Sequence, residues 1–301
     1  MECKGYIIKI SFLICIILIS SNLFAADPSV LQAEQVVVIF EEPLRSVAEE
    51  VAKRYPSIKQ DLENTFQWLV DFRPTLVLVK SGEQFQKIAG TDLIVAFAVP
   101  KKKLMVIDYS KMNISPFTLG ATLKHELCHL LLHHYIDRHR LPKWLDEGIC
   151  QWASDGIVEV IMGSDRSVLA RAGLRGRYFP MRVLNTRFPG DKASLQLAYA
   201  QSKNFVDYIS REFGRDAVLH LLNNLRNGLA FEAAIAESFS ISFEGLEKEW
   251  LDQIRKKNTW FTYLTIHVYE FLFVFGAVIL VIGFVRAMIK KRRYRDEEDD
   301  E

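Results

Sequence analysis

The feature that most constrains this chain is an apolar segment near its C-terminus, "VYEFLFVFGAVILVIGFVRAMI", from Val268 to Ile289. It holds about 22 residues, and a helix of that length crosses roughly 30 Å of hydrocarbon. Aromatic residues precede it and "KKRRYR" follows it, so the positive-inside rule places the basic end in the cytoplasm. The sequence therefore predicts one transmembrane helix over residues 268–289 and a charged cytoplasmic tail over 290–301.

The N-terminal 26 residues have the pattern of a secretory signal peptide. Lys4 and Lys9 form a positive start, an apolar run follows over residues 10–19, and Ala25-Ala26 offer small residues for cleavage. An uncleaved N-terminal anchor is the alternative. With the C-terminal helix, this pattern predicts an extracytoplasmic domain over residues 27–260, held in the cell (inner) membrane by a single span.

Charge and cysteine content narrow the classes of protein further. The 301 residues carry a formal net charge of +1, and no basic face dominates, so nucleic acid is excluded as the expected partner. Removal of the signal peptide leaves Cys128 and Cys150 as the cysteines of the mature chain. An exported domain lies where such a pair can oxidise.

The exported part combines short strands with helices. Residues 35–40 and 75–79 read as strands, and "LIVAFAV" and "LMVIDY" on either side of "PKKK" read as an antiparallel hairpin. Residues 44–70 have helical periodicity, and Pro56 predicts a break in it. From Pro116 onward the chain looks mainly helical. An α+β domain is the fold class that this pattern predicts.

The stretch "HELCH" places His125, Glu126 and His129 on a predicted helix over residues 118–135. Four residues turn a helix through about 400°, so the two imidazoles project from nearly the same face. Both can then reach one Zn²⁺ at about 2.0–2.1 Å. Glu126 lies about 100° away around the helix, where it cannot join them as a ligand but can act as general base on a water at the metal.

A third ligand is expected from "LPKWLDEGICQW", where a second helix starts after Pro142. Two helices joined by a short loop pack side by side, so Glu147 can face the two imidazoles and complete a His₂Glu site for one zinc ion. Asp146 is the alternative ligand, but it points about 100° away on the same helix. His133 continues the histidine face of the first helix and is expected at the surface.

These residues resemble the gluzincin zinc metallopeptidases, most closely the peptidase MA-like family, in which H-E-L-x-H and W-L-x-E-G stand on successive helices. The resemblance extends over roughly residues 36–254. It implies a zincin-like fold, with a small mixed sheet and an active-site helix before a mainly helical part. It also implies zinc ligands at His125, His129 and Glu147 and a base at Glu126. Some gluzincins have a carboxylate where this chain has Gln151, whose amide can hold an imidazole only more weakly.

The resemblance also bears on transition-state stabilisation and on substrate binding. Tyr199, in "LQLAYAQSKNFVDYI", is the expected donor to the oxyanion, with His220 as the rival. A structural role for the Tyr199 hydroxyl is the other interpretation. In zincin folds an edge strand pairs with an extended substrate backbone, and here either residues 93–99 or residues 104–109 would do this.

The sequence thus predicts a membrane-anchored zinc metallopeptidase that hydrolyses a peptide or protein substrate. No segment of the type that recognises a substrate N-terminus is evident, which favours an endopeptidase. The alternative is a non-catalytic, zinc-containing binding or scaffold module tethered to the membrane, although such a module has no use for a base at Glu126. Cys128 and Cys150 each follow a ligand by three residues, so they form a candidate disulfide.

Overall fold

The computed structural model describes residues 28–112, 114, 117–154, 165–174, 176–266 and 268–298. The predicted signal peptide lies outside these described residues. The chain divides into two compact units, Met1–Lys248 and Glu249–Glu301, and each is described by itself.

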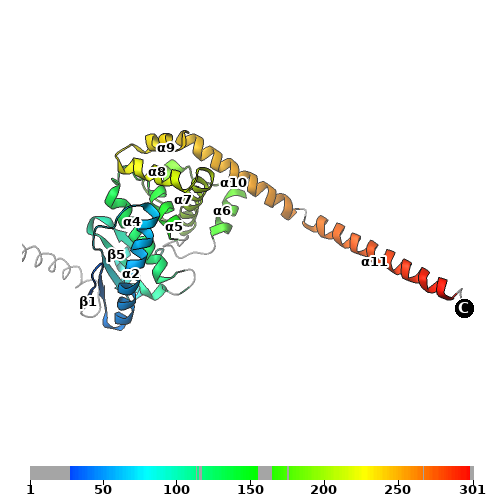
Figure 1. Ribbon diagram of the computed structural model, residues 1–301, viewed down its shortest axis with the longest axis horizontal. Coiled ribbons are helices and arrows are strands. Elements are labelled where there is room, and N and C mark those ends of the chain that lie inside the picture. Colours follow the sequence, from blue (N-terminus) through cyan, green and yellow to red (C-terminus); the bar gives the residue numbers. More distant parts are fainter. Residues whose placement is uncertain are drawn as a thin grey trace, which may run out of the picture. The chain divides into compact units, whose positions relative to one another are not determined.

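The first unit contains a five-stranded mixed sheet with the strand order β1-β2-β3-β5-β4 (Figure 1). The strands are β1 (Ser29–Gln32), β2 (Val37–Phe40), β3 (Thr75–Val79), β4 (Ala96–Val99) and β5 (Leu104–Asp108). The three central strands are parallel, whereas β1 and β4 are antiparallel edge strands. The predicted hairpin is therefore present. Its first strand lies at the edge of the sheet and its second lies inside it.

Successive side chains of the central strands point to opposite faces of the sheet, and both faces are covered. On one face α3 (Gly82–Ala89) packs Phe85 against Ile39, Val77 and Val106. The strand residues of opposite parity are buried under α2 (Arg45–Phe66) and α4 (Leu119–Tyr135), which contact the sheet and each other. The sheet thus supports α4, the helix that carries the histidine motif.

Helix α2 runs without interruption through Pro56, so the predicted break at this residue is wrong. Proline removes the hydrogen bond that its nitrogen would donate to the carbonyl of Ala52. Pro56 is exposed, and water can satisfy the freed carbonyl on that side of the helix. Val51, Tyr55 and Leu62 on the opposite face are fully buried, and this burial maintains the helix across the proline.

The rest of the first unit is mainly helical, as predicted, and the domain is α+β. After α4 come α5 (Lys143–Ala153), α6 (Asp165–Leu174), α7 (Lys192–Phe213), α8 (Arg215–Arg226) and α9 (Phe231–Phe239). Helix α10 (Phe243–Ile266) begins in the first unit and continues into the second. Within the described part of the chain, 3₁₀ turns lie at Glu42–Leu44, Pro100–Lys102, Tyr109–Lys111 and Met181–Leu184. Helix α5 contacts both α4 and α7. It is therefore the element through which the motif helix and α7 meet.

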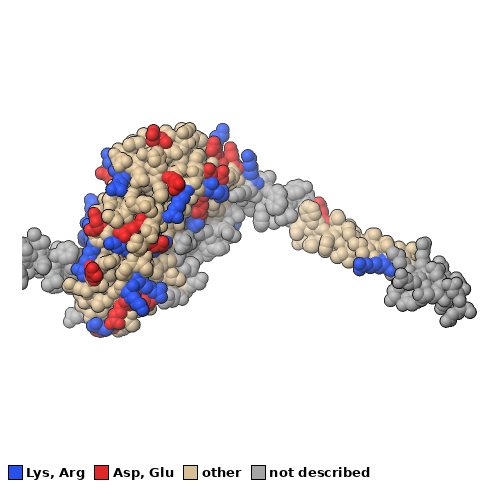
Figure 2. Space-filling view, in the orientation of Figure 1, with Lys and Arg blue, Asp and Glu red and all other residues tan. Residues whose placement is uncertain are grey.

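Trp144 at the start of α5 anchors the core of this helical part. Its ring is fully buried and packs against three phenylalanines at centroid distances of 5.0 to 6.0 Å, namely Phe205, Phe231 and Phe243. Its indole N–H donates to Oδ1 of Asn185 at 3.1 Å. Trp144 is thus a core residue. On the visible face of this unit, cationic and anionic side chains are interspersed (Figure 2).

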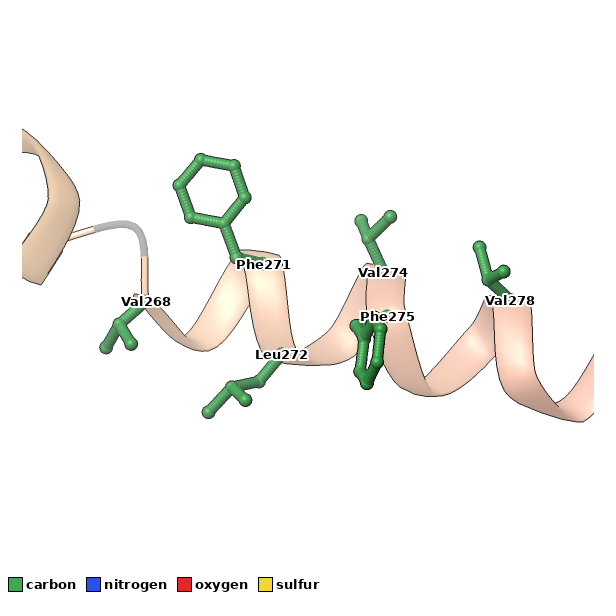
Figure 3. Close-up of a pocket in the computed structure, with 6 residues that line it drawn as sticks. All are labelled: Val268, Phe271, Leu272, Val274, Phe275 and Val278. Atoms are coloured by element: carbon green, nitrogen blue, oxygen red, sulfur yellow. The ribbon is translucent and has the colours of Figure 1, made fainter.

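The second unit contains α11 (Val268–Glu298), whose first part is long and apolar enough to cross a membrane. The span Val268–Met288 has 21 residues and a mean hydropathy of 2.5, and none of it is buried. Figure 3 shows how its side chains project outward, among them Phe271, Leu272 and Phe275. A helix with apolar residues exposed all round is typical of a membrane span. The chain is compatible with a single-pass membrane protein.

Candidate metal centre

Helix α4 brings the two motif histidines together on one buried face. The helix begins after Thr118, whose Oγ1 accepts a hydrogen bond from the backbone N–H of Ala121 at 3.4 Å. One turn separates His125 from His129, and their rings meet edge to face with centroids 4.8 Å apart. The two Nε2 atoms lie 3.1 Å from each other. The helix alone therefore fixes the spacing of two nitrogen ligands.

The other ring nitrogens determine which tautomer each imidazole adopts. Nδ1 of His129 lies 2.8 Å from Oδ1 of Asp146 and donates to it. Nδ1 of His125 lies 3.2 Å from the hydroxyl oxygen of Ser154. That hydroxyl gives its own proton to the carbonyl of Cys150, so its oxygen accepts from His125. With both Nδ1 atoms acting as donors, each ring in its neutral form presents an Nε2 lone pair to the centre.

Glu147 on α5 faces these two nitrogens. Its Oε2 lies 3.9 Å from Nε2 of His125 and 3.5 Å from Nε2 of His129. Ligands about 2.0–2.1 Å from a tetrahedral zinc ion lie about 3.3 Å from one another. The three ligand atoms have nearly this spacing, and all three side chains are buried. The geometry and the donor types therefore fit one zinc ion.

Asp146, the alternative ligand, lies on the opposite edge of the His129 ring. Oδ1 accepts from His129, and Oδ2 lies 2.9 Å from Nε2 of His133. Its carboxylate forms a second close group with His129 and Cys150. That group uses Nδ1 of His129, whereas the group with Glu147 uses Nε2. Asp146 thus orients His129 and does not share a ligand sphere with His125.

The buried charges around His129 strongly perturb the pKa values of the site. Burial by itself lowers the pKa of His129, but the carboxylates of Asp146 and Glu147 outweigh it and raise that pKa well above its usual value. Burial raises the pKa of Asp146, and attraction to His129 and His133 reverses this and leaves it lowered. Burial, together with the adjacent Cys128, raises the pKa of Cys150 well above its usual value. The centre therefore attracts cations and keeps its thiol protonated.

The two oxygens of Glu147 face different groups. Oε2 faces the imidazoles, while Oε1 accepts from Nζ of Lys143 at 2.8 Å and lies 3.5 Å from the hydroxyl of Tyr199. Glu126, fully buried on α4, directly follows His125. The structure thus places the hydroxyl of Tyr199 next to Glu147. Glu126, the base expected from the sequence, lies on the same helix as His125 and His129.

Gly148 explains how Tyr199 reaches Glu147 from α7. A Cβ atom at Gly148 would lie 2.6 Å from the carbonyl oxygen of Ser202 and 2.7 Å from Cγ2 of Val206. Only glycine allows α5 and α7 to approach so closely. The hydroxyl of Tyr199, one helical turn before Ser202, consequently lies beside the ligand that precedes Gly148.

Other expectations about the site need correction or extension. The side-chain amide of Gln151 donates to the carbonyl of Tyr199 at 3.3 Å and does not hold an imidazole. Ser154 takes that position instead, two helical turns after Glu147 and so on the same face of α5. His133 is half-buried against Asp146, not at the open surface, because α5 covers that side of α4. His220, the rival of Tyr199, is exposed on α8.

A mixed sheet that supports a two-histidine helix, with a carboxylate from the next helix, is the arrangement of a zincin-like fold. The sequence agrees, because residues 92–256 match the Peptidase MA superfamily. This match covers more than half of the 301 residues, and the chain belongs to that superfamily.

Among solved structures, the fold is similar to that of yeast LTA4 hydrolase in complex with bestatin. The TM-score is 0.45 and the sequence identity 16%; the match covers 75% of this chain and 38% of the other. Curated protein sequences give no match.

Proposed function

We propose that this chain is a membrane-anchored zinc metallopeptidase that hydrolyses peptide bonds, with an endopeptidase mode of action. The observation that carries the proposal is the buried group of His125, His129 and Glu147, whose ligand atoms have the spacing of a zinc site. Membership of the Peptidase MA superfamily supports the same class of reaction. A zinc ion held there supplies Lewis-acid polarisation of the scissile carbonyl and acidifies a water molecule.

Two side chains of the protein have separate tasks in the reaction: Glu126 transfers protons, and Tyr199 stabilises the negative charge that develops. Glu126 accepts a proton from the attacking water and delivers it to the leaving amine. Tyr199 donates a hydrogen bond to the oxyanion that forms from the carbonyl. Its hydroxyl lies beside Glu147, and its ring is held by Phe188, which meets it edge to face at 5.1 Å. The phenol is thus already oriented before substrate binds.

The edge strand β4 is the segment that we propose binds the substrate backbone. Its partner β5 lies inside the sheet, so of the two strands considered from the sequence only β4 has an unpaired edge. Helix α4 contacts β4, and Ile94, just before the strand, packs against Tyr199. An extended peptide paired with β4 would run past the metal centre in both directions, which suits cleavage within a chain.

The membrane topology and a disulfide belong to the same proposal. The exposed apolar span of α11 anchors the chain, with the catalytic unit outside the cytoplasm and the C-terminus inside.

The Sγ atoms of the free, buried Cys128 and Cys150 lie 2.6 Å apart. In an oxidising compartment the two thiols lose two protons and two electrons to a disulfide-class oxidant, which is reduced to two thiols.

The test uses the full-length chain in detergent, loaded with zinc and mixed with a peptide library. Wild-type protein should cleave internal peptide bonds, and Glu126→Gln should bind the same amount of zinc without cleavage. If the zinc-loaded wild type cleaves no peptide or protein, the peptidase proposal fails and a tethered zinc-binding scaffold becomes the better account.

A further inference from the structure

The third histidine of α4 has a partner that connects it to the metal centre. Nε2 of His133 lies 2.9 Å from Oδ2 of Asp146, while Oδ1 of the same carboxylate lies 2.8 Å from Nδ1 of His129. The Asp146 side chain on α5 is therefore held between two imidazoles that stand one turn apart on α4. The His133 side chain is 17% exposed and that of Asp146 is 11% exposed, so water competes little for either contact.

A carboxylate with two oxygens can rotate about its side-chain bonds unless both oxygens are engaged. His129 alone would leave Oδ2 free to turn toward another donor. Donation from the Nε2–H of His133 fixes the plane of the carboxylate, and Oδ1 then stays in line with Nδ1 of His129. This arrangement keeps the lone pair of His129 Nε2 directed at Glu147 and His125.

We propose that His133 is a positioning residue for the metal centre, acting through Asp146 on the ligand His129. This inference rests on the proposed zinc site, but not on the proposed peptidase activity. Three histidines of the motif helix then have two roles: His125 and His129 hold the metal, and His133, one turn further along, orients the ligand His129.

The neighbouring His134 provides a matched control on the same helix. Its Nε2 lies 2.8 Å from Oδ1 of Asp71, so it too forms a histidine–aspartate pair. Asp71, however, is 59% exposed and precedes β3, away from α5. Replacing His134 removes a comparable pair and a comparable ring without touching Asp146.

The experiment measures zinc affinity of the full-length chain in detergent by competition with a chromophoric chelator. His133→Phe keeps an aromatic ring but loses the donor, and it should weaken zinc binding about 10–100-fold, the usual cost of removing such a supporting hydrogen bond. His133→Gln restores an N–H donor and should bind zinc more tightly than His133→Phe. His134→Phe should bind zinc as the wild type does.

A double-mutant cycle distinguishes positioning from general destabilisation of α4. If His133 acts through Asp146, adding His133→Phe to Asp146→Asn should weaken zinc binding less than His133→Phe does alone. Wild-type zinc affinity in His133→Phe, an equal loss in His134→Phe, or full additivity in the cycle would each overturn the proposal. If His133→Phe does not fold, the same cycle is measured with His133→Ala, which also lacks the donor, and His133→Gln should again bind zinc more tightly than the variant without a donor. A wild-type chain that binds no zinc would overturn both this inference and the proposed function, whereas zinc binding without peptide cleavage would overturn only the latter.

Discussion

At the scale of single residues, the centre is defined by which atom of each side chain is already engaged. Ser154 and Asp146 accept hydrogen bonds from Nδ1 of His125 and His129. Lys143 donates a hydrogen bond to one oxygen of Glu147. What is left facing inward is two nitrogen lone pairs and one carboxylate oxygen. The hydrogen bonds around the ligands thus decide the chemistry at the centre as much as the ligands themselves do.

Tyr199→Phe tests the proposed oxyanion donor. Removing one such donor costs about 2.7–4 kcal/mol of activation free energy, so turnover should fall about 10²–10³-fold. The Michaelis constant and the zinc content should stay near those of the wild type, because the phenyl ring still packs on Phe188. Steady-state kinetics with a cleaved peptide measures both constants.

Tyr208→Phe is the matched control, since Tyr208 is a buried tyrosine on the same helix that stacks on Phe205. Its turnover should equal that of the wild type. Unchanged turnover in Tyr199→Phe would show that the hydroxyl of Tyr199 has only a structural role.

The motif residues could be predicted from the sequence because helical periodicity alone places His125 and His129 on one face. Glu147 required one further step, the packing of two helices joined by a short loop. The partners of the imidazoles could not be predicted, because they depend on how α5 is rotated against α4. That rotation brings Asp146 and Ser154 to the rings and turns the amide of Gln151 toward α7.

At the scale of elements, α5 is the centre of the arrangement, because it contacts α4 on one side and α7 on the other. The close approach at Gly148 positions α7, and hydrogen bonds from His125 and His129 to Ser154 and Asp146 join α4 to α5. Strands β2 to β5 could be predicted from the sequence, but their positions in the sheet could not. Their β-branched residues predicted strands, but only the strand order shows that β4 has a free edge and β5 does not. Pro56 shows a further limit of prediction from sequence. The burial of one face of α2 keeps the helix continuous at a proline, a residue that usually interrupts a helix.

Gly148→Ala should destabilise the protein. The added methyl group would meet the backbone carbonyl of Ser202, which cannot move without shifting α7, and overpacking of this kind costs about 1–3 kcal/mol. Denaturant unfolding of the first unit, followed by tryptophan fluorescence, measures the loss.

Gly120→Ala in the first turn of α4 is the control, because its methyl group would meet only Nη1 of Arg54 at 3.7 Å. It should be neutral or stabilising, since alanine favours a helix over glycine. Equal free energies of unfolding for Gly148→Ala and the wild type would contradict the proposed close packing of α5 and α7.

The proposed disulfide between α4 and α5 can be tested on protein isolated without reductant. Cys128 and Cys150 should resist alkylation after denaturation and become reactive only after reduction, as mass spectrometry would show. Their separation of 22 residues predicts that reduction lowers the free energy of unfolding by about 3 kcal/mol. Two alkylated cysteines in the unreduced, denatured chain would rule the bond out.

At the scale of the whole molecule, the chain consists of a unit that carries the candidate metal centre and a unit that contains the apolar helix. The length and hydropathy of Val268–Met288 predicted the helix directly, because membrane spans are determined by local sequence. The orientation of the span is a proposal, which we base on the charges that flank it.

Protease added to the outside of spheroplasts should therefore digest the first unit and leave a small protected C-terminal fragment. An epitope placed after Glu301 should remain on that fragment, since "KKRRYR" retains the C-terminus in the cytoplasm. Lysed cells, in which the epitope becomes accessible, serve as the control. Digestion of the epitope in unlysed spheroplasts would contradict the proposed topology.

The most direct test of the account is X-ray absorption spectroscopy at the zinc edge on the zinc-loaded, full-length protein. The structure contains two buried groups that share His129, one with His125 and Glu147 and one with Asp146 and Cys150. The account predicts two imidazole nitrogens and oxygen at about 2.0–2.1 Å, with no sulfur in the coordination sphere. A sulfur ligand at about 2.3 Å would place the ion with Cys150 and contradict the assignment of His125, His129 and Glu147 as the metal ligands.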